Sequence, residues 1–181
     1  MTVTETNLKG CFVLEPAVFK DERGYFFESF NKHIFEKAIG HEISFVQDNQ
    51  SYSLHGVIRA LHYQLGEYAQ AKLVRVLQGR VLDVAVDLRK ESATFGQHVA
   101  IELSADNHKQ MFIPKGFAHG FSVLSKSAEF FYKCDNFYNK SAEAGIIYND
   151  SDLAIEWRIP NQSIKVSDKD LVLPNFKKAL L

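Results

Sequence analysis

The sequence predicts an all-β protein, an antiparallel β-sandwich or jelly-roll barrel with short peripheral helices. Short strand-like runs follow one another at fairly regular spacing, and helical patterns occur only towards the two ends. Aromatic residues make up 13% of the chain, with 15 Phe and 7 Tyr, and such residues favour strands. Because a barrel of this class has an open mouth, the fold itself predicts where a ligand pocket would lie.

The N-terminal part is predicted to hold strands, a turn and one helix. Residues 11–19 (CFVLEPAVF) form a predicted strand that Pro16 interrupts, and residues 21–24 (DERG) form a turn that opens into an aromatic strand. Residues 31–40 (NKHIFEKAIG) have helical spacing, and Gly40 suits the end of the helix. The residues expected to share one face are Phe30, Ile34, Phe35 and Ala38.

Strand-like runs fill most of the remaining chain. In residues 80–89, Leu82, Val84, Val86 and Leu88 fall on one face, whereas Asp83 and Asp87 fall on the other. Gln78-Gly79 just before this run predicts a hairpin turn. Residues 167–181 mix turn residues with a pattern that suits a short closing helix. The other predicted strands are 43–53, 57–64, 72–79, 98–104, 110–124, 129–138, 145–150 and 154–157.

Length and charge limit the classes of protein. The 181 residues suit one domain, and 46% hydrophobic residues are enough for a full core. A net charge of −1 gives no basic surplus for nucleic acid or an anionic membrane surface. We expect a cytoplasmic protein, because there is no signal-peptide pattern and no bilayer-spanning apolar run. Cys11 and Cys134 are expected to be free thiols, although the sequence leaves one disulfide open.

Two short motifs contain the histidines of interest, RALHYQ at 59–64 and PKGFAHG at 114–120. The second has Pro-x-Gly-x-x-His, a spacing found in the second motif of cupins, which are small jelly-roll barrels that often hold a metal. The first cupin motif has His-x-His followed by Glu, and its counterpart here is His62, Gln64 and Glu67. An amide oxygen is a poor ligand for the metals that imidazole sites hold, so we expect a pocket without a metal.

The polar side chains along the predicted barrel suit proton transfer. A neutral imidazole such as His62 removes a proton from a carbon next to a carbonyl, and the ammonium of Lys72 stabilises the resulting enolate. A phenol such as Tyr132 donates a proton on the opposite face. Each of these residues equally suits an ordinary core or surface position in a strand. The candidates by chemistry are Arg23, Glu28, Gln47, Asn49, Arg59, His62, Lys72, His119 and Tyr132.

A set of longer motifs carries a resemblance to a known family. They are FKDERGYFFESF, FVQDNQSYS, GVIRALHYQ, QAKLVRVLQGRVLDVAVDLRKESATFGQ, FIPKGFAHGFSVL, AEFFYKCDNFY, and a late YND, IEW and VSDKD. In this order, from about residue 10 to residue 174, they resemble the dTDP-4-dehydrorhamnose 3,5-epimerases. The resemblance implies a cofactor-free, cupin-fold enzyme of dTDP-L-rhamnose synthesis. Such an enzyme inverts C3 and C5 of dTDP-4-dehydro-6-deoxy-D-glucose through enolate intermediates.

The matching motif positions imply a role for each site residue. His62 corresponds to the catalytic base, and Asp170 to the carboxylate that orients and charge-stabilises it. Tyr132 corresponds to the opposing acid, and Lys72 to the residue near the developing enolate. Tyr138 corresponds to the aromatic residue that stacks on the thymine base. The other residues implied to line the nucleotide-sugar site are Arg23, Glu28, Gln47, Asn49, Arg59, His119, Glu143 and Lys169.

The resemblance also implies a homodimer. In the family the N-terminal strands cross to the neighbouring subunit, so the single jelly-roll domain expected for residues 1–181 would exchange these strands with its partner. Arg23 and Glu28 are then expected to reach the partner's site.

Three positions depart from the family pattern. Ala60 stands where the family usually has Gly, and its methyl group either narrows the pocket or only shifts packing. Phe112 and Tyr148 stand where the family often has Trp, and both keep an aromatic ring. No departure removes a proposed catalytic group.

Four alternatives to the leading function stay open at this point. One is an epimerase that acts at one carbon only or on another dTDP-4-keto-6-deoxy sugar. A second is a 3,4-ketoisomerase, which carries another His shortly after the first, where this chain has HYQ. A third is a metal-dependent cupin oxygenase, against which Gln64 argues. The last is an inactive sugar-nucleotide-binding jelly roll, which has no need for a matched acid and base.

Overall fold

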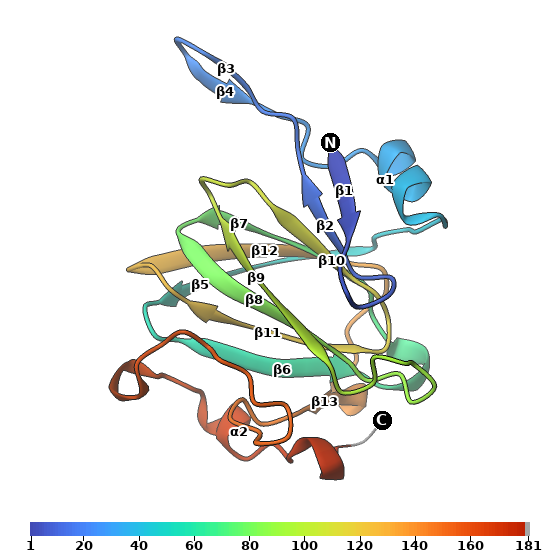
Figure 1. The fold of residues 1–181 in the computed structure, drawn as a ribbon, viewed down its shortest axis with the longest axis vertical. Helices are drawn as coiled ribbons and strands as arrows, with labels where there is room; N and C mark the ends of the chain where they lie inside the picture. The colour runs from blue at the N-terminus through green and yellow to red at the C-terminus, as the bar shows by residue number, and fades with distance from the viewer. Residues whose placement is uncertain (180–181) are drawn as a thin grey trace.

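A computed structural model describes residues 1–179, whose strands form two main antiparallel sheets facing each other as a jelly roll (Figure 1). The six-stranded sheet has the order β1 (Thr2–Glu5), β2 (Phe12–Glu15), β10 (Gln110–Ile113), β7 (Lys72–Gln78), β12 (Ser127–Cys134) and β5 (Gln47–Leu54). The five-stranded sheet has the order β13 (Glu143–Gly145), β6 (Ile58–Gln64), β11 (Phe117–Val123), β8 (Arg80–Asp87) and β9 (His98–Ser104). The predicted all-β jelly-roll class is confirmed.

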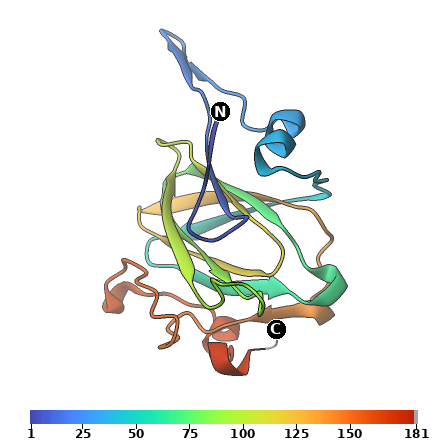
Figure 2. The ribbon, with the colours of Figure 1, turned by 45° about the vertical axis from the view of Figure 1, so that its right-hand side comes forward.

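Three apolar clusters hold the two sheets and their coverings together. One lies between the sheets and includes Val74, Val81, Phe121 and Phe130. A second lies on the outer face of the five-stranded sheet, where the C-terminal segment runs across β6 and β13 (Figures 1 and 2). The third lies under helix α1 (Lys32–Ile39) on the six-stranded sheet. The space between the sheets is therefore closed by a core at one end, which leaves the other end for a cavity.

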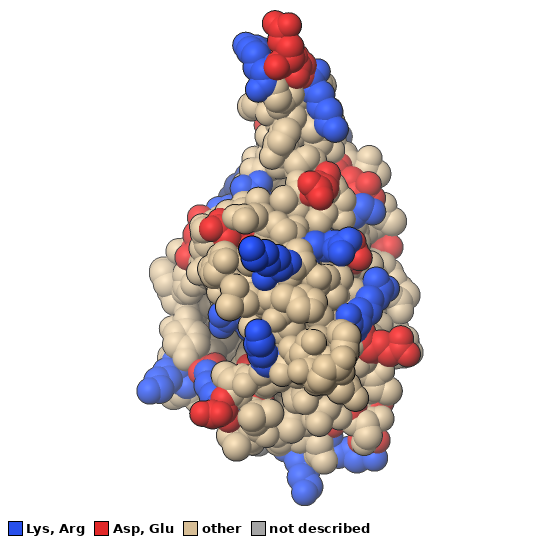
Figure 3. All heavy atoms as spheres, turned by 90° about the vertical axis from the view of Figure 1, so that its left-hand side faces the viewer, with Lys and Arg blue, Asp and Glu red and all other residues tan. Residues whose placement is uncertain are grey.

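The N-terminal strands β3 (Phe19–Asp21) and β4 (Gly24–Phe26) form a hairpin that projects from the body (Figures 1 and 3). Asp21 pairs with Gly24, so the predicted turn at 21–24 is confirmed, and the interruption at Pro16 separates β3 from β2. Every residue of both strands is exposed, and Phe26 is 71% exposed. In the single chain this hairpin has aromatic side chains facing solvent.

The predicted helix is confirmed, but its predicted face is partly wrong. The Asn31 side chain accepts a hydrogen bond from the N–H of Ile34, and Gly40, at φ 80°, ends the helix. Phe35 and Ile39 are buried, whereas Ile34 is 42% exposed and Ala38 is also exposed. The helix touches the sheet along one narrow ridge, with the Phe35 ring edge-on to Phe112 at 5.2 Å.

The predicted hairpin at Gln78-Gly79 is wrong. Strand β7 pairs with β10 and β12, and β8 pairs with β9 and β11, so the two strands belong to different sheets. Gly79 lies at φ 79°, and a Cβ there would come 2.0 Å from the carbonyl oxygen of Ser127. The connection is thus a tight corner that carries the chain from one sheet to the other, and only glycine fits it.

Two of the late predicted strands are also wrong. Residues 154–157 are not a strand, and the run at 145–150 is a strand only up to Gly145, the end of β13. Their apolar side chains cover the outer face of the five-stranded sheet, where Ile146 and Trp157 are buried. Beyond them, α2 (Asp168–Leu171) confirms the short closing helix, while Leu180 and Leu181 lie outside the described residues. Short 3-10 turns occur at Gly66–Tyr68, Lys140–Ala142, Asn161–Ser163 and Phe176–Lys178.

Both faces of β8 are buried, including its two carboxylates. Asp87 accepts hydrogen bonds from Arg89, Ser92 and Thr94. Burial opposes ionisation of Asp87, but these donors outweigh it and hold the pKa of the carboxyl well below its usual range. Asp83 points between the sheets, towards the site described below.

The remaining expectations concern cysteines and membranes. Cys11 and Cys134 are free thiols, as the sequence predicts, and both are buried. Within residues 1–179, no helix combines the length and the apolar character needed to span a membrane.

Candidate active site

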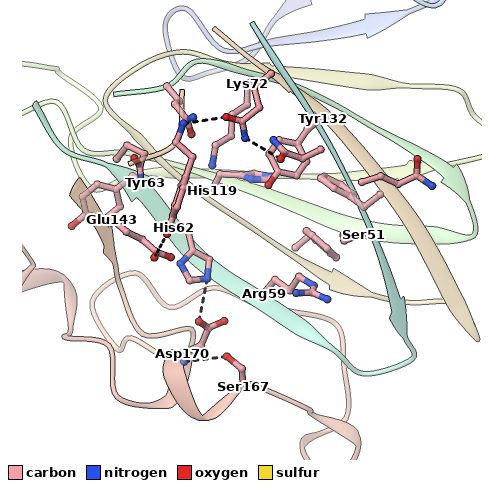
Figure 4. A pocket seen from close by; sticks show the side chains of 18 of the residues that line it. Ser51, Arg59, His62, Tyr63, Lys72, His119, Tyr132, Glu143, Ser167 and Asp170 are labelled. Carbon is pink, nitrogen blue, oxygen red and sulfur yellow. Dashed lines mark hydrogen bonds and ion pairs between the residues drawn. The ribbon is translucent and has the colours of Figure 1, made fainter. Parts of the chain in front are cut away.

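A cavity of about 510 Å³ opens between the two sheets (Figure 4). Every predicted site residue except Arg23 and Glu28 lines it. The predicted residues it brings together are Gln47, Asn49, Arg59, His62, Lys72, His119, Tyr132, Tyr138, Glu143, Lys169 and Asp170. They come from both sheets and from the C-terminal segment, so the site depends on the complete fold.

A bulge in β6 places both Arg59 and His62 in the cavity. His62 lies opposite His119 of β11, and Arg59 lies opposite Phe121, so three steps on β6 match two steps on β11. Two β6 residues, Ala60 and Leu61, therefore stand opposite the single β11 residue Gly120, and both are fully buried in the cluster outside the sheet. Ala60 therefore does not line the cavity, and its methyl group is a packing feature rather than part of the cavity wall.

His62 is paired with Asp170, which lies in the first turn of α2. The Nε2 atom of His62 lies 3.2 Å from Oδ1 of Asp170 (Figure 4). Burial opposes ionisation of Asp170, but the hydrogen bond and charge of His62, together with Ser167, hold the pKa of this carboxyl below its usual value. The Nδ1 atom of His62 is buried and has no hydrogen-bond partner among residues 1–179. One ring nitrogen thus faces a carboxylate while the other keeps a free lone pair.

Lys72 and Tyr132 face His62 from the opposite sheet. Lys72 on β7 and Tyr132 on β12 point between the sheets, with the Lys72 ammonium 5.9 Å from the centre of the Tyr132 ring. Burial lowers the pKa of Lys72 and raises the pKa of Tyr132. A phenol that holds its proton and a poorly solvated ammonium therefore lie across the cavity from the imidazole.

A second imidazole–carboxylate pair lies deeper in the barrel. His119 Nε2 is 2.8 Å from Oδ1 of Asp83, and both residues are buried. Burial lowers the pKa of His119, although Asp83 acts against it, so the ring is neutral near pH 7. Oδ2 of Asp83 finds no partner within the described part of the chain.

The mouth of the cavity has an aromatic side chain beside charged groups. Tyr138 is half exposed, and its hydroxyl donates a hydrogen bond of 2.8 Å to Glu143. The ammonium of Lys169 bonds the other oxygen of Glu143. Burial opposes ionisation of Glu143, but Lys169 and Tyr138 hold its pKa below the usual value. With Arg59 and Lys72 further in, the lining presents cations and an exposed ring to a bound molecule.

The comparison with known proteins agrees with this geometry. The family model for dTDP-4-dehydrorhamnose 3,5-epimerase matches residues 5–178. The chain belongs to this epimerase family. The enzyme class that the motifs predicted, an isomerase acting on nucleotide-linked sugars, is confirmed.

Individual relatives are similar over nearly the whole chain. The dTDP-4-dehydrorhamnose 3,5-epimerase of Shigella flexneri is 55% identical and covers 94% of this chain and 93% of its own. The crystal structure of the enzyme from Elizabethkingia anophelis is 55% identical with a TM-score of 0.94, covering 98% and 97% of the two chains. A 3,5-epimerase structure from Legionella pneumophila, in complex with dTDP-4-keto-L-rhamnose, is 46% identical with a TM-score of 0.93, covering 98% and 93%.

The donors of the cupin-type metal motif are engaged elsewhere in this epimerase. His62 and His119 each face a carboxylate, and the Gln64 side-chain oxygen accepts a hydrogen bond of 2.8 Å from the backbone of Asn139. Glu67 does not line the cavity. Across residues 1–179, no group of three or more His, Cys, Asp or Glu side chains is arranged to hold a metal ion.

Sequence reasoning missed several residues that line the cavity. Three of them follow from strand alternation: Ser51 shares a face with Asn49, Phe121 with His119, and Phe130 with Tyr132. Gln64 likewise shares a face with His62, whereas alternation from the predicted site residues does not account for the rest. The complete missed set is Gln50, Ser51, Tyr63, Gln64, Gln70, Phe121, Phe130 and Ser167.

The single chain does not bring Arg23 and Glu28 to the cavity. Arg23 lies at the tip of the projecting hairpin and pairs with Asp21 at 2.6 Å. Glu28 accepts a hydrogen bond of 3.2 Å from Asn31, just before α1. Neither side chain lines the cavity of its own chain.

Proposed function

We propose that this epimerase inverts C3 and C5 of dTDP-4-dehydro-6-deoxy-D-glucose and so forms dTDP-4-dehydro-L-rhamnose for dTDP-L-rhamnose synthesis. The observation that carries the proposal is the placement of an imidazole and a phenol on opposing sheets of one cavity. Inversion at carbon requires removal of a proton from one face and its return to the other, which such a pair provides. The dTDP-sugar bound by the Legionella relative supports this class of substrate.

His62 is the proposed base for both carbons. The hydrogens on C3 and C5 are acidic because both carbons flank the C4 carbonyl. As the C–H bond breaks, its electrons form an enolate with the C4 oxygen, and the proton moves to the imidazole. Asp170, 3.2 Å from the ring, stabilises the imidazolium that forms.

Lys72 and Tyr132 complete each inversion at the opposite wall. The buried ammonium of Lys72 stabilises the negative charge on the enolate oxygen, an interaction that the low-dielectric surroundings strengthen. Tyr132 keeps its proton near pH 7, because burial raises its pKa, and delivers it to carbon, at least at C5. Exchange with solvent then returns a proton to Tyr132 and removes one from His62. The net change moves only protons, so the chemistry needs no electron acceptor.

The nucleotide is proposed to lie along the mouth. Arg59 and Lys169 suit the diphosphate, with His119, Gln47, Asn49 and Glu143 around the sugar and its linkage. Tyr138, which is 51% exposed, offers its ring to the thymine base.

A homodimer is proposed to complete the site. The β3–β4 hairpin projects from the body (Figure 3). It carries exposed aromatic side chains, and Arg23 at its turn pairs with the neighbouring Asp21. We infer that the hairpin docks on a second copy and that Arg23 and Glu28 act at the partner's cavity. Buried free thiols and a nucleotide-linked substrate support the cytoplasm as the compartment.

Turnover in heavy water tests this function. The protein is incubated with dTDP-4-keto-6-deoxyglucose in deuterium oxide, and the product is read by NMR. We expect deuterium at both C3 and C5 and inversion of both centres. Deuterium at one carbon only would support a single-carbon epimerase, and a carbonyl moved to C3 would support a ketoisomerase. If deuterium enters at neither C3 nor C5, the proposal is overturned.

A further inference from the structure

We propose that Gln64 is a positioning residue that holds Tyr138 in place over the mouth of the cavity. It would do so through the loop of residues 135–139, whose backbone its side chain binds. The inference rests on the proposed function, since it concerns how tightly the thymidine nucleotide binds.

Three backbone groups in the loop of residues 135–139 are bound by glutamine side chains. The N–H of Asn139 donates to the side-chain oxygen of Gln64 at 2.8 Å, and the N–H of Tyr138 donates to that of Gln47 at 3.1 Å. The side-chain amide of Gln70 donates to the carbonyl oxygen of Asn136 at 2.8 Å. A segment without regular secondary structure needs such partners, because unpaired backbone groups are costly when partly buried.

These glutamines tie the loop to both walls of the cavity. Gln47 lies on β5 of the six-stranded sheet, and Gln64 lies on β6 of the five-stranded sheet. Gln64 is also paired in register with Glu143 of β13, and Glu143 accepts the hydroxyl hydrogen of Tyr138. Gln64 thus binds the backbone of Asn139, the residue after Tyr138. Glu143, which is paired with Gln64, binds the Tyr138 hydroxyl.

The direction of the Gln64 side chain separates this role from direct substrate binding. Although the residue lines the cavity, its side-chain oxygen accepts the Asn139 N–H, so this oxygen binds the loop. Replacing Gln64 by Met keeps the approximate shape but leaves that N–H without its acceptor. Loss of one such bond is expected to weaken nucleotide binding about 5-fold by letting Tyr138 leave its position.

A double-mutant cycle with thymidine diphosphate tests the inference. Calorimetry measures Kd for the wild type, Gln64→Met, Tyr138→Ala and the double variant. We expect Gln64→Met to raise Kd about 5-fold when Tyr138 is present and less than about 2-fold when it is absent. Gln97→Met, the same change in the exposed loop before β9, serves as the matched control and is expected to leave Kd unchanged.

Steady-state kinetics adds a readout that general destabilisation would not give. Gln64→Met is expected to raise KM for the sugar nucleotide while kcat stays within about 2-fold, because His62 and Tyr132 keep their places. An equal rise in Kd with and without Tyr138, or a fall in kcat at unchanged KM, would overturn the inference while leaving the proposed function intact. If the wild type neither binds thymidine diphosphate nor turns over the sugar, the proposed function fails, and this inference fails with it.

Discussion

Neighbouring residues around the proposed base act on different properties of the enzyme. Asp170 contacts the imidazole of His62 inside the cavity, whereas Ala60, two positions before His62, packs on the outer face of the sheet. Replacing Asp170 should change kcat, whereas replacing Ala60 should change only the free energy of unfolding.

Asp170→Asn tests the role of the carboxylate. The neutral amide keeps the shape of the side chain but no longer stabilises an imidazolium, so kcat is expected to fall about 100-fold or more. Thymidine diphosphate binding, measured by calorimetry, should stay close to the wild type. A variant with near-normal kcat would show that His62 works without this partner.

The same variant carries a pH prediction for stability. The pKa of Asp170 in the folded protein lies below its usual value, because His62 and Ser167 outweigh the effect of burial. Its charge therefore stabilises the fold above the usual carboxyl pKa, about 4, and this contribution is lost as pH falls through the folded pKa. Urea titrations should show the difference in unfolding free energy between wild type and Asp170→Asn shrinking below about pH 4. Growth of that difference in acid would contradict the assignment.

Ala60→Gly restores the residue that the family usually has. Ala60 is fully buried outside the cavity, so the ratio of products at C3 and C5 is expected to stay the same. Loss of a buried methyl group and added backbone freedom should lower the free energy of unfolding by about 1–2 kcal/mol. A shift in product ratio, read by NMR, would show that position 60 does shape the pocket.

At the level of elements, the bulge in β6 explains why the site was only partly predictable from sequence. Simple alternation puts Arg59 and His62 on opposite faces of a strand, and only the three-to-two register with β11 brings them to the same side. The Gln78-Gly79 corner was mistaken for a hairpin because a short turn does not reveal which sheet each strand joins. Likewise, Ile146 and Trp157 are apolar because they pack over the face of a sheet. A segment that covers a sheet and a strand within a sheet have the same apolar pattern in the sequence.

Other parts of the site were predictable because their signals are local. Lys72 and Tyr132 each lie in a strand with clear alternation, and the motif around His119 correctly marked a cavity residue. Asp170 is different, since it reaches His62 from a short helix far along the chain. No periodicity links the two residues, so only the family resemblance paired them.

Gly120→Ala tests whether the bulge positions the base. A Cβ at residue 120 would come 2.7 Å from both the Arg59 carbonyl oxygen and the Ala60 Cβ. We expect a loss of about 1–3 kcal/mol in unfolding free energy and a fall in kcat as β6 shifts. Adding Ala60→Gly should recover only part of the lost unfolding free energy and only part of the lost kcat, because the contact with the Arg59 backbone remains. Normal activity in Gly120→Ala would mean that the bulge geometry is not needed.

At the level of the whole molecule, we propose that the projecting hairpin contributes to a site shared between two subunits. Mixing two inactive variants, Arg23→Ala and His62→Ala, and refolding them together tests this. If Arg23 acts at the partner's cavity, each mixed dimer has one intact site, and about a quarter of the wild-type activity should return. If Arg23 acts within its own chain, no activity returns, and the shared site is contradicted.

The proposed chemistry depends most on the placement of the base on one sheet and the acid on the other. Tyr132→Phe in heavy water, followed by NMR of the sugar, tests it most directly. We predict that His62 still removes the C5 proton, so deuterium enters at C5, but that almost no C5-inverted product forms because no acid faces it. Inversion of C5 at the wild-type rate in Tyr132→Phe would contradict the account.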